Sequence, residues 1–225
     1  MGDVFALPRS LIEMVPLVAA SARGWQQAVD AILSGKVVAF PTDTVYGIGC
    51  SAFDVDAIKL IYELKGRTTT KALPLLLSDP THLQRVAITP PPTASKLGEE
   101  FWPGALTLVM KRRAELPVEL SGDDTIALRV PDHRQMRDFL EACGGFLAVT
   151  SANLSGQPDA LTAQEVLGYF ERGVAMVVDG GPVAGGRPST VIDCTRGAPV
   201  LLRQGAIPRE DIEDILQLKA SDRNV

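Results

Sequence analysis

Cysteine and histidine are scarce in this sequence, and the few that occur lie far apart. The 225 residues include three cysteines, at positions 50, 143 and 194, and two histidines. A structural zinc site needs clustered ligands and a disulfide framework needs paired cysteines, so the sequence argues against both. Because disulfide frameworks are typical of oxidising compartments, we predict a cytoplasmic protein that binds no metal through its own side chains.

Long apolar runs and an excess of positive charge are also lacking. Residues 11–20 are mildly apolar, but Glu13 and Pro16 interrupt them and the stretch is too short to span a membrane. The formal net charge is −5, whereas a protein that binds nucleic acid as its main partner is usually basic. The sequence therefore argues against a membrane protein and against bulk electrostatic binding of DNA or RNA.

Three common catalytic signatures are missing as well. No Gly-x-x-x-x-Gly-Lys-Ser/Thr segment is present, which argues against a P-loop enzyme. No Gly-x-Gly-x-x-Gly dinucleotide fingerprint follows a predicted strand. No histidine lies near Ser151 in the sequence to activate it, which disfavours a serine hydrolase.

The composition is that of a folded globular protein, with 46 % hydrophobic and 22 % charged residues. Helical spacing of apolar residues and short apolar runs alternate irregularly along the chain, which predicts an α/β domain with a twisted mixed parallel/antiparallel sheet and helices packed around it. We expect this single domain to span residues 23–219, with an N-terminal extension or edge strand in residues 1–22 and a tail in residues 220–225. The predicted helices lie around residues 25–33, 55–62, 136–140 and 208–218, and two more helix starts are predicted at Asp79-Pro80 and at the capping box of residues 162–165. The predicted strands lie at 37–40, 73–77, 106–110, 126–130, 146–149, 176–178 and 190–192.

Four polar clusters follow predicted strands or helices, where loops usually carry function. Hydroxyl and amide groups in two of them suit a carboxylate or a nucleotide, the basic cluster suits phosphate, and the glycine-rich cluster offers backbone N–H groups to anions. Each cluster also has a purely structural interpretation, as a capped turn or a solvated basic helix end. The clusters are Pro-Thr-Asp-Thr-Val-Tyr-Gly at 41–47, Lys-Gly-Arg at 65–67 with Lys71, Thr-Ser-Ala-Asn-Leu-Ser-Gly at 150–156, and the segment from Gly-Gly at 180–181 to Leu-Arg-Gln-Gly at 202–205.

Eight motifs, most of them within these clusters, resemble the YrdC-like family of threonylcarbamoyl-AMP synthases, from about residue 26 to about residue 216. Any one of the motifs is weak, whereas eight in the same order are specific. They are Pro-Thr-Asp-Thr-Val-Tyr-Gly at 41–47, Lys-Gly-Arg at 65–67, Trp-Pro-Gly-Ala-Leu-Thr at 102–107, Arg-Val-Pro-Asp-His at 129–133, Thr-Ser-Ala-Asn at 150–153, Val-Asp-Gly-Gly at 178–181, Ser-Thr-Val-Ile-Asp at 189–193 and Leu-Arg-Gln-Gly-Ala-Ile at 202–207.

The resemblance implies a large basic cavity and an enzyme, a nucleotidyltransferase acting as L-threonylcarbamoyladenylate synthase. It would form threonylcarbamoyl-AMP and pyrophosphate from L-threonine, bicarbonate and ATP, for threonylcarbamoyladenosine modification of tRNA. The resemblance places L-threonine near Thr44, Arg129, Ser151 and Ser189, and ATP near Arg67, Lys71, Thr125, Asn153 and Arg203. It makes Lys65, Arg67 and Arg203 the catalytic residues.

The expected reaction needs no protein nucleophile, because the attacking carbamate is already anionic. Mg²⁺ would bind through the ATP phosphates and keep most of its waters. Further partners would be the separate proteins that transfer the threonylcarbamoyl group, and tRNA. Two other interpretations stay open: a non-catalytic module with the same fold that binds tRNA or double-stranded RNA, and a relative that uses another acyl-adenylate or carbamoyl substrate.

Overall fold

A computed structural model describes residues 14–66, 72–183 and 187–216 of the chain. Ten strands form one sheet, in the order β1-β8-β2-β3-β7-β4-β6-β5-β9-β10. The strands are β1 Leu17–Ala19, β2 Val38–Phe40, β3 Gly47–Ser51, β4 Leu75–Leu77, β5 Leu106–Lys111, β6 Thr125–Arg129, β7 Phe146–Ser151, β8 Val177–Asp179, β9 Thr190–Asp193 and β10 Val200–Arg203.

The sheet mixes the two kinds of strand pairing, as the sequence predicts. Strand β8 pairs in parallel with β1 and β2, and the pairs β4–β6 and β5–β9 are also parallel. The pairs β2–β3, β3–β7, β4–β7, β5–β6 and β9–β10 are antiparallel. For residues 1–22 the sequence left an extension and an edge strand open, and the described part of that segment contributes the edge strand β1. The boundaries 23–219 and 220–225 remain predictions.

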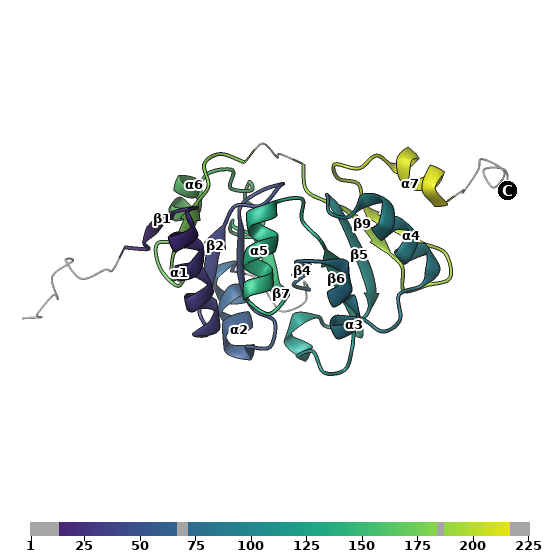
Figure 1. The fold of residues 1–225 in the computed structure, drawn as a ribbon, viewed down its shortest axis with the longest axis horizontal. Coiled ribbons are helices and arrows are strands. Elements are labelled where there is room, and N and C mark those ends of the chain that lie inside the picture. The colour runs from purple at the N-terminus through teal and green to yellow at the C-terminus, as the bar shows by residue number, and fades with distance from the viewer. Residues whose placement is uncertain (1–13, 67–71, 184–186, 217–225) are drawn as a thin grey trace, which may run out of the picture.

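Helices cover the sheet and connect its strands (Figure 1). Two of the predicted helix starts carry the expected caps: Asp54 accepts a hydrogen bond from the Ala57 amide, and Thr162 with Glu165 completes a capping box. The helices are α1 Ala22–Leu33, α2 Val55–Leu64, α3 Leu83–Val86, α4 Pro92–Phe101, α5 Arg134–Ala142, α6 Ala163–Tyr169 and α7 Arg209–Leu216, with 3₁₀ turns at Pro80–His82 and Val118–Leu120. No helix among the described residues is long and apolar enough to cross a membrane.

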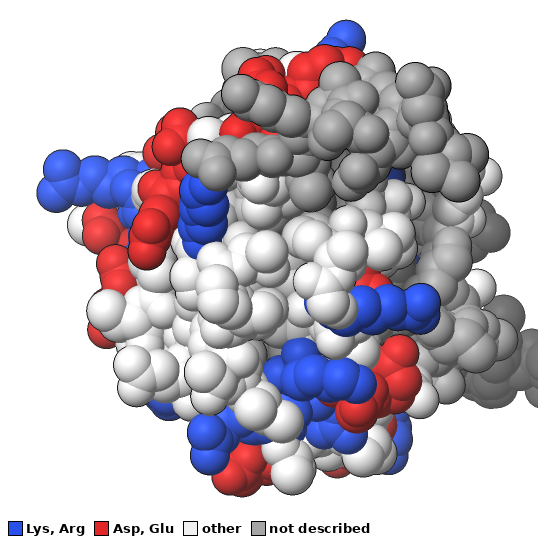
Figure 2. Space-filling view, turned by 90° about the vertical axis from the view of Figure 1, so that its right-hand side faces the viewer, with Lys and Arg blue, Asp and Glu red and all other residues white. Residues whose placement is uncertain are grey.

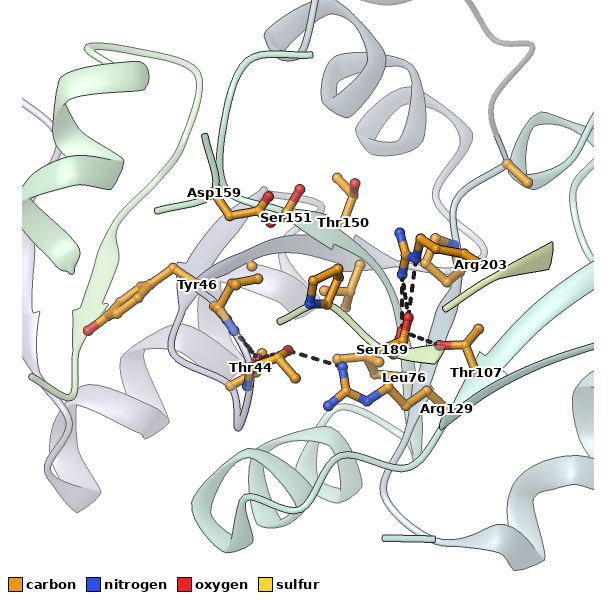
Figure 3. Close-up of a pocket in the computed structure, with 17 residues that line it drawn as sticks. Thr44, Tyr46, Leu76, Thr107, Arg129, Thr150, Ser151, Asp159, Ser189 and Arg203 are labelled. Carbon is orange, nitrogen blue, oxygen red and sulfur yellow. Dashed lines mark hydrogen bonds between the residues drawn. The ribbon is translucent and has the colours of Figure 1, made fainter. Parts of the chain in front are cut away.

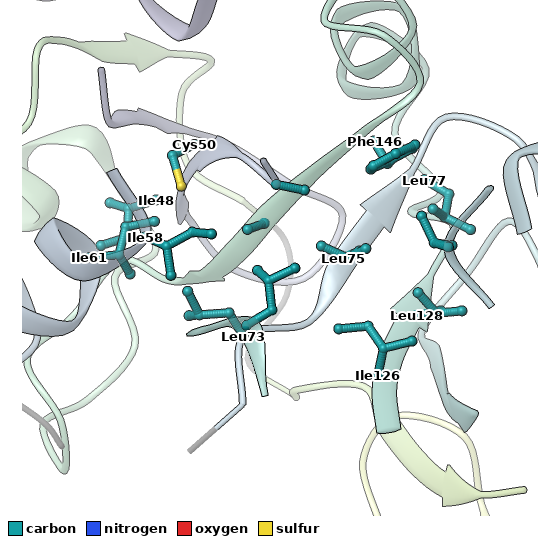
Figure 4. Packing of buried hydrophobic residues seen from close by; sticks show 14 of the residues in the cluster. Ile48, Cys50, Ile58, Ile61, Leu73, Leu75, Leu77, Ile126, Leu128 and Phe146 are labelled. Atoms are coloured by element: carbon teal, nitrogen blue, oxygen red, sulfur yellow. The ribbon is translucent and has the colours of Figure 1, made fainter. Parts of the chain in front are cut away.

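Two apolar clusters hold the layers together. In one, α1 and α5 pack on the sheet, where the Phe139 ring lies 5.2 Å from Trp25 and 5.4 Å from Phe40 between ring centroids. The larger cluster joins α2, α4, α6 and α7 to the sheet and contains fully buried side chains such as Ile58 and Leu75 (Figure 4). Burying such side chains stabilises the fold by about 1.5–3 kcal/mol each relative to exposure.

Strand β3 is an element that the sequence analysis missed, because two of its five residues are glycines, which disfavour strands. The structure shows why glycine is needed here. A Cβ atom on Gly47 would lie 3.0 Å from Cγ1 of Val149, and one on Gly49 would lie 2.9 Å from Cζ of Phe40. The glycines therefore let the neighbouring strands place large apolar side chains across the face of β3.

Helix α4 and strand β10 were missed too. Strand β10 is an edge strand and, among the described strands, pairs only with β9. Its side chains at Val200 and Leu202 are exposed, so no alternation of buried and exposed residues marks it.

On the face of the molecule shown in Figure 2, lysines and arginines are interspersed with acids, and the centre of that face is uncharged.

Candidate active site

A cavity of about 410 Å³ opens where several strands end. Its walls come from the loop before β3, the start of β4, the ends of β6, β7 and β10, and the segment before β9 (Figure 3). The lining residues are Thr42, Thr44, Val45, Tyr46, Gly47, Ala72, Pro74, Leu76, Thr107, Arg129, Val149, Thr150, Ser151, Asp159, Pro188, Ser189 and Arg203. Among them are two arginines and one aspartate.

Arg129 lies at one end of the cavity and is held by three neighbours. Its Nη2 donates to Oδ2 of Asp43 at 2.6 Å, Nη1 to Oγ1 of Thr44 at 3.1 Å, and Nε to the carbonyl of Gly104 at 2.9 Å. Only 6 % of Arg129 is exposed. Burial lowers the pKa of Arg129, and the Asp43 carboxylate opposes that shift, so the guanidinium stays charged and its charge is balanced locally.

The loop before β3 fixes Thr44 against that arginine. The hydroxyl of Thr42 donates to the carbonyl of Val45 at 2.6 Å and accepts from the amides of Thr44 and Val45 at 3.2 and 3.3 Å. Oδ1 of Asp43 is buried and has no hydrogen-bond partner among the described residues. The turn predicted at 41–44 is therefore self-capped, and its side chains also reach the cavity.

Arg203 lies on the same side of the cavity as Arg129 (Figure 3), but it has a different environment. Its Nε and Nη2 donate to the carbonyl of Ser189 at 3.1 and 3.0 Å, and Nη2 also reaches the Ser189 hydroxyl at 3.2 Å. That hydroxyl lies 2.7 Å from Oγ1 of Thr107. Arg203 is exposed and forms no ion pair with an acid in the described parts of the chain, so its positive charge is available to a ligand.

Ser151 lines a third wall of the cavity, and Lys65 bonds the turn that contains Ser151 without lining the cavity itself. The Lys65 ammonium donates to the carbonyls of Ser151 and Asn153 at 2.5 and 2.8 Å and to Oδ1 of Asn153 at 2.9 Å. The Ser151 hydroxyl also donates to Oδ1 of Asn153, at 2.6 Å. Only 3 % of Lys65 is exposed, so its charge organises the Ser151–Asn153 turn from inside the protein.

The structure brings most of the predicted site residues together. The four residues predicted to bind threonine, Thr44, Arg129, Ser151 and Ser189, all line the cavity, as does Arg203. Lys65 and Asn153 do not line the cavity, but Lys65 bonds Asn153, and Asn153 bonds Ser151, which does line it. The predicted Arg67 and Lys71 lie outside the described residues.

Thr125 is another predicted site residue that does not line the cavity. It begins β6, whereas Arg129 ends that strand, which separates them by about 13 Å along an extended chain. Its hydroxyl donates to Oδ1 of Asp123 at 2.6 Å. Its assignment to ATP remains a prediction.

Thr107, Asp159 and Leu76 line the cavity although the sequence analysis gave them no role in binding. Thr107 ends the motif at 102–107 and faces the cavity from strand β5, but the motif does not show which of its side chains reaches the cavity. The Asp159 carboxylate has no hydrogen bond or ion pair to another described residue. No group of three or more potential metal ligands occurs in the part of the chain that the structure describes.

Known proteins resemble this chain over most of its length. The family model for Sua5, YciO and YrdC, described as telomere recombination, matches residues 30–205. The threonylcarbamoyl-AMP synthase of Bacillus subtilis is 41 % identical over 192 residues, which cover 84 % of this chain and 56 % of that protein. The chain therefore spans little more than half the length of this curated relative.

Two solved structures share the fold. The crystal structure of Sua5 from Pyrococcus abyssi complexed with L-threonine superposes with a TM-score of 0.85 at 38 % identity, over 90 % of this chain and 61 % of that one. YciO from E. coli gives a TM-score of 0.76 at 28 % identity, over 87 % of this chain and 96 % of that one. Both likenesses extend over most of the mixed sheet that builds the cavity.

Proposed function

The chain belongs to the Sua5/YciO/YrdC family, and we propose that it is an L-threonylcarbamoyladenylate synthase, a nucleotidyltransferase. It would make threonylcarbamoyl-AMP and pyrophosphate from L-threonine, bicarbonate and ATP, for threonylcarbamoyladenosine modification of tRNA. The observation that carries the proposal is the convergence of Thr44, Arg129, Ser151 and Ser189 with Arg203 on one cavity. A relative of this chain, P. abyssi Sua5, has been crystallised with L-threonine.

L-threonine would occupy the part of the cavity between Arg129 and Ser189. Guanidinium and hydroxyl donors suit its carboxylate, and the apolar side chains of Leu76 and Val149 on the same walls suit its methyl group. The three hydrogen bonds that hold Arg129 use three of its five N–H groups, so donors remain for a ligand.

ATP would bind with its phosphates toward Arg203, the described cavity arginine whose charge no carboxylate balances. Arg67 and Lys71 complete the proposed phosphate-binding group, and Ala72, which follows them, lines the cavity. Asn153 would act through the turn that it shares with Ser151. Mg²⁺ would enter bound to ATP, and the donor set fits that role because one unpaired carboxylate, Asp159, suffices for an ion that keeps its waters.

The reaction would proceed through two balanced steps. The threonine amine combines with bicarbonate and releases water to give a carbamate. A carbamate oxygen then attacks the α-phosphorus of ATP, and the bond to the bridging oxygen breaks to release pyrophosphate. Two unit charges about 4 Å apart repel by about 4 kcal/mol at an effective dielectric near 20, so holding these anions together requires cationic groups.

The protein would contribute positioning and electrostatic stabilisation rather than a nucleophile. Arg203 would stabilise the developing phosphate charge. Lys65 would act differently from the sequence-based expectation of direct catalysis, because its ammonium is hydrogen-bonded to the Ser151–Asn153 turn: we propose that it positions this turn. The proposed setting is the cytoplasm, with tRNA and separate threonylcarbamoyl-transfer proteins downstream.

The deciding experiment measures pyrophosphate release from ATP and Mg²⁺, with L-threonine and bicarbonate each present or omitted. Release should require both and should fall when L-serine replaces L-threonine. Well-folded protein that releases no pyrophosphate in response to threonine would contradict the proposal. RNA binding that weakens steeply with salt, without ATP turnover, would instead identify an RNA-binding module.

A further inference from the structure

The cavity contains a pair of hydroxyl groups from two neighbouring strands. Thr107 is on β5, and Ser189 directly precedes β9, which pairs in parallel with β5. Their oxygens are 2.7 Å apart, and each residue is 6 % exposed. Both residues line the cavity beside Arg203 (Figure 3).

Counting protons shows what this pair presents to a ligand. Each hydroxyl has one proton and two lone pairs. The guanidinium of Arg203 can only donate, so its 3.2 Å bond to the Ser189 hydroxyl occupies a lone pair of that oxygen. The 2.7 Å contact uses one of the two hydroxyl protons, whichever residue donates.

The second hydroxyl proton has no acceptor among the described residues, whichever way the first one points. If Thr107 donates to Ser189, the serine proton is left over; if Ser189 donates, the threonine proton is left over. In both cases the pair offers the cavity one donor. Because a cation already donates into the pair, its remaining proton is polarised toward an acceptor, and an anionic oxygen is the acceptor that gains most.

We propose that Thr107 and Ser189 act as one shared hydrogen-bond donor for an anionic oxygen of the amino-acid substrate. Thr107 is then a second binding residue, able to supply this donor when Ser189 lacks its hydroxyl. This inference rests on the proposed function, which supplies the substrate, and goes beyond it by adding a residue and a coupling. Each single variant keeps one hydroxyl with its own proton, so the donor is lost only when both hydroxyls are removed, whereas independent hydroxyl contacts would contribute separately.

A double-mutant cycle tests the coupling. Thr107→Val removes one hydroxyl while keeping the branched shape, Ser189→Ala removes the other, and the third variant carries both changes. Titration calorimetry with L-threonine gives Kd for each, and pyrophosphate release gives KM for threonine and for ATP. Each single variant keeps one hydroxyl proton and should bind threonine within about threefold of the unchanged protein. The double variant lacks the donor, and loss of a hydrogen bond to a charged group should weaken its threonine binding about tenfold or more.

The double variant should therefore bind threonine more weakly than the product of the two single effects predicts, because only this variant lacks the donor. Thr107→Ser combined with Ser189→Ala is the matched control, and because it keeps one hydroxyl its Kd should lie within about threefold of that of Ser189→Ala. The KM for ATP and the melting temperature should change little. Should Thr107→Val not fold, Thr107→Ala takes its place in the cycle.

A loss of about tenfold or more in either single variant, or single effects that only multiply in the double variant, would overturn the shared donor and leave the proposed function standing. If the unchanged protein binds threonine but releases no pyrophosphate, the proposed function fails, and the Kd series still decides the coupling. If it neither binds threonine nor releases pyrophosphate, both are overturned.

Discussion

The two arginines of the cavity are chemically identical and yet sit in opposite environments. Arg129 is 6 % exposed, and its 2.6 Å bond to the Asp43 carboxylate balances its charge. Arg203 is exposed and bonds only the carbonyl and hydroxyl of Ser189 among the described residues. The first arginine is therefore part of the folded framework, and the second carries an uncompensated charge at the surface of the cavity.

The difference shows that one arginine can fix the shape of a cavity while another supplies its positive charge. A buried ion pair costs desolvation and fixes a geometry, because its partners must stay together. An arginine held only by neutral acceptors keeps its attraction for anions. We therefore expect Arg129 to shape the pocket for threonine and Arg203 to bind the anionic phosphates, and each expectation predicts a different failure on substitution.

Removal of Arg203 should have the largest effect, and the effect should be on the reaction. Arg203→Ala should lower turnover by about two to three orders of magnitude, as loss of one preorganised donor to a developing charge commonly does. Because the side chain is exposed, the free energy of unfolding should change by less than about 0.5 kcal/mol. Pyrophosphate release and a denaturant titration of the same preparation check both parts.

Arg203→Lys is the matched control for that variant, because it keeps the charge and loses the planar fork. It should recover part of the turnover. If Arg203→Ala turned over at the normal rate, Arg203 would have no part in the reaction. The two arginines would then differ in environment but not in catalytic role.

Substitution of Asp43 should have the next largest effect, and it should be on stability. Asp43→Ala leaves the buried Arg129 guanidinium without its carboxylate, which should lower the free energy of unfolding by about 3 kcal/mol or more. Urea unfolding measures the change. Asp43→Asn keeps an acceptor for Nη2 of Arg129, so its free energy of unfolding should fall by less. If both variants were as stable as the unchanged protein, the ion pair would make no contribution to stability.

The smallest effect is expected from a third charged cluster, outside the cavity. Glu141 accepts from the Ser78 hydroxyl at 2.6 Å and pairs with His82 at 2.8 Å, and these hydrogen bonds lower the pKa of its carboxyl. A lowered native pKa stabilises the fold above the usual glutamate pKa near 4.3, and the gain is lost as the pH falls below it.

Between about pH 5 and pH 3, the Glu141→Gln variant should therefore lose less stability on acidification than the unchanged protein. Its pyrophosphate release at neutral pH should be unchanged. Melting temperatures of the variant and the unchanged protein across that range measure the difference. An acid-induced loss as steep in the variant as in the unchanged protein would mean that Glu141 does not contribute. A large loss of turnover would show that this cluster acts on the cavity, although its residues do not line it.

Much of the fold is written in local patterns. The helices at Ala22–Leu33 and Arg134–Ala142 follow from apolar residues at helical spacing, and the strand at Phe146–Ser151 follows from a short apolar run. Strand β3 could not be predicted in this way. Its glycines are explained by the Phe40 and Val149 side chains that cross them, and those are contacts between residues distant in sequence.

The site shows the same division. Motifs in a fixed order identified Thr44, Arg129, Ser151, Ser189 and Arg203, and the structure places these five on one cavity. The sequence could not show that Lys65 faces the Ser151–Asn153 turn, or that Thr107 lies against Ser189. Such contacts depend on which strands pair in the sheet, and the sequence around a threonine within a strand does not show which residue of the next strand it contacts.

By itself the sequence determined the fold class, most helices and strands, and the residue types available for binding anions, because these depend on local spacing and composition. Only the tertiary structure decided which charges are available. Arginine has the same chemistry at positions 129 and 203, but the fold brings Asp43 to the first and, among the described residues, only the Ser189 carbonyl and hydroxyl to the second. The balance of a charge depends on what lies within a few ångströms of it, and that is set by packing between distant segments.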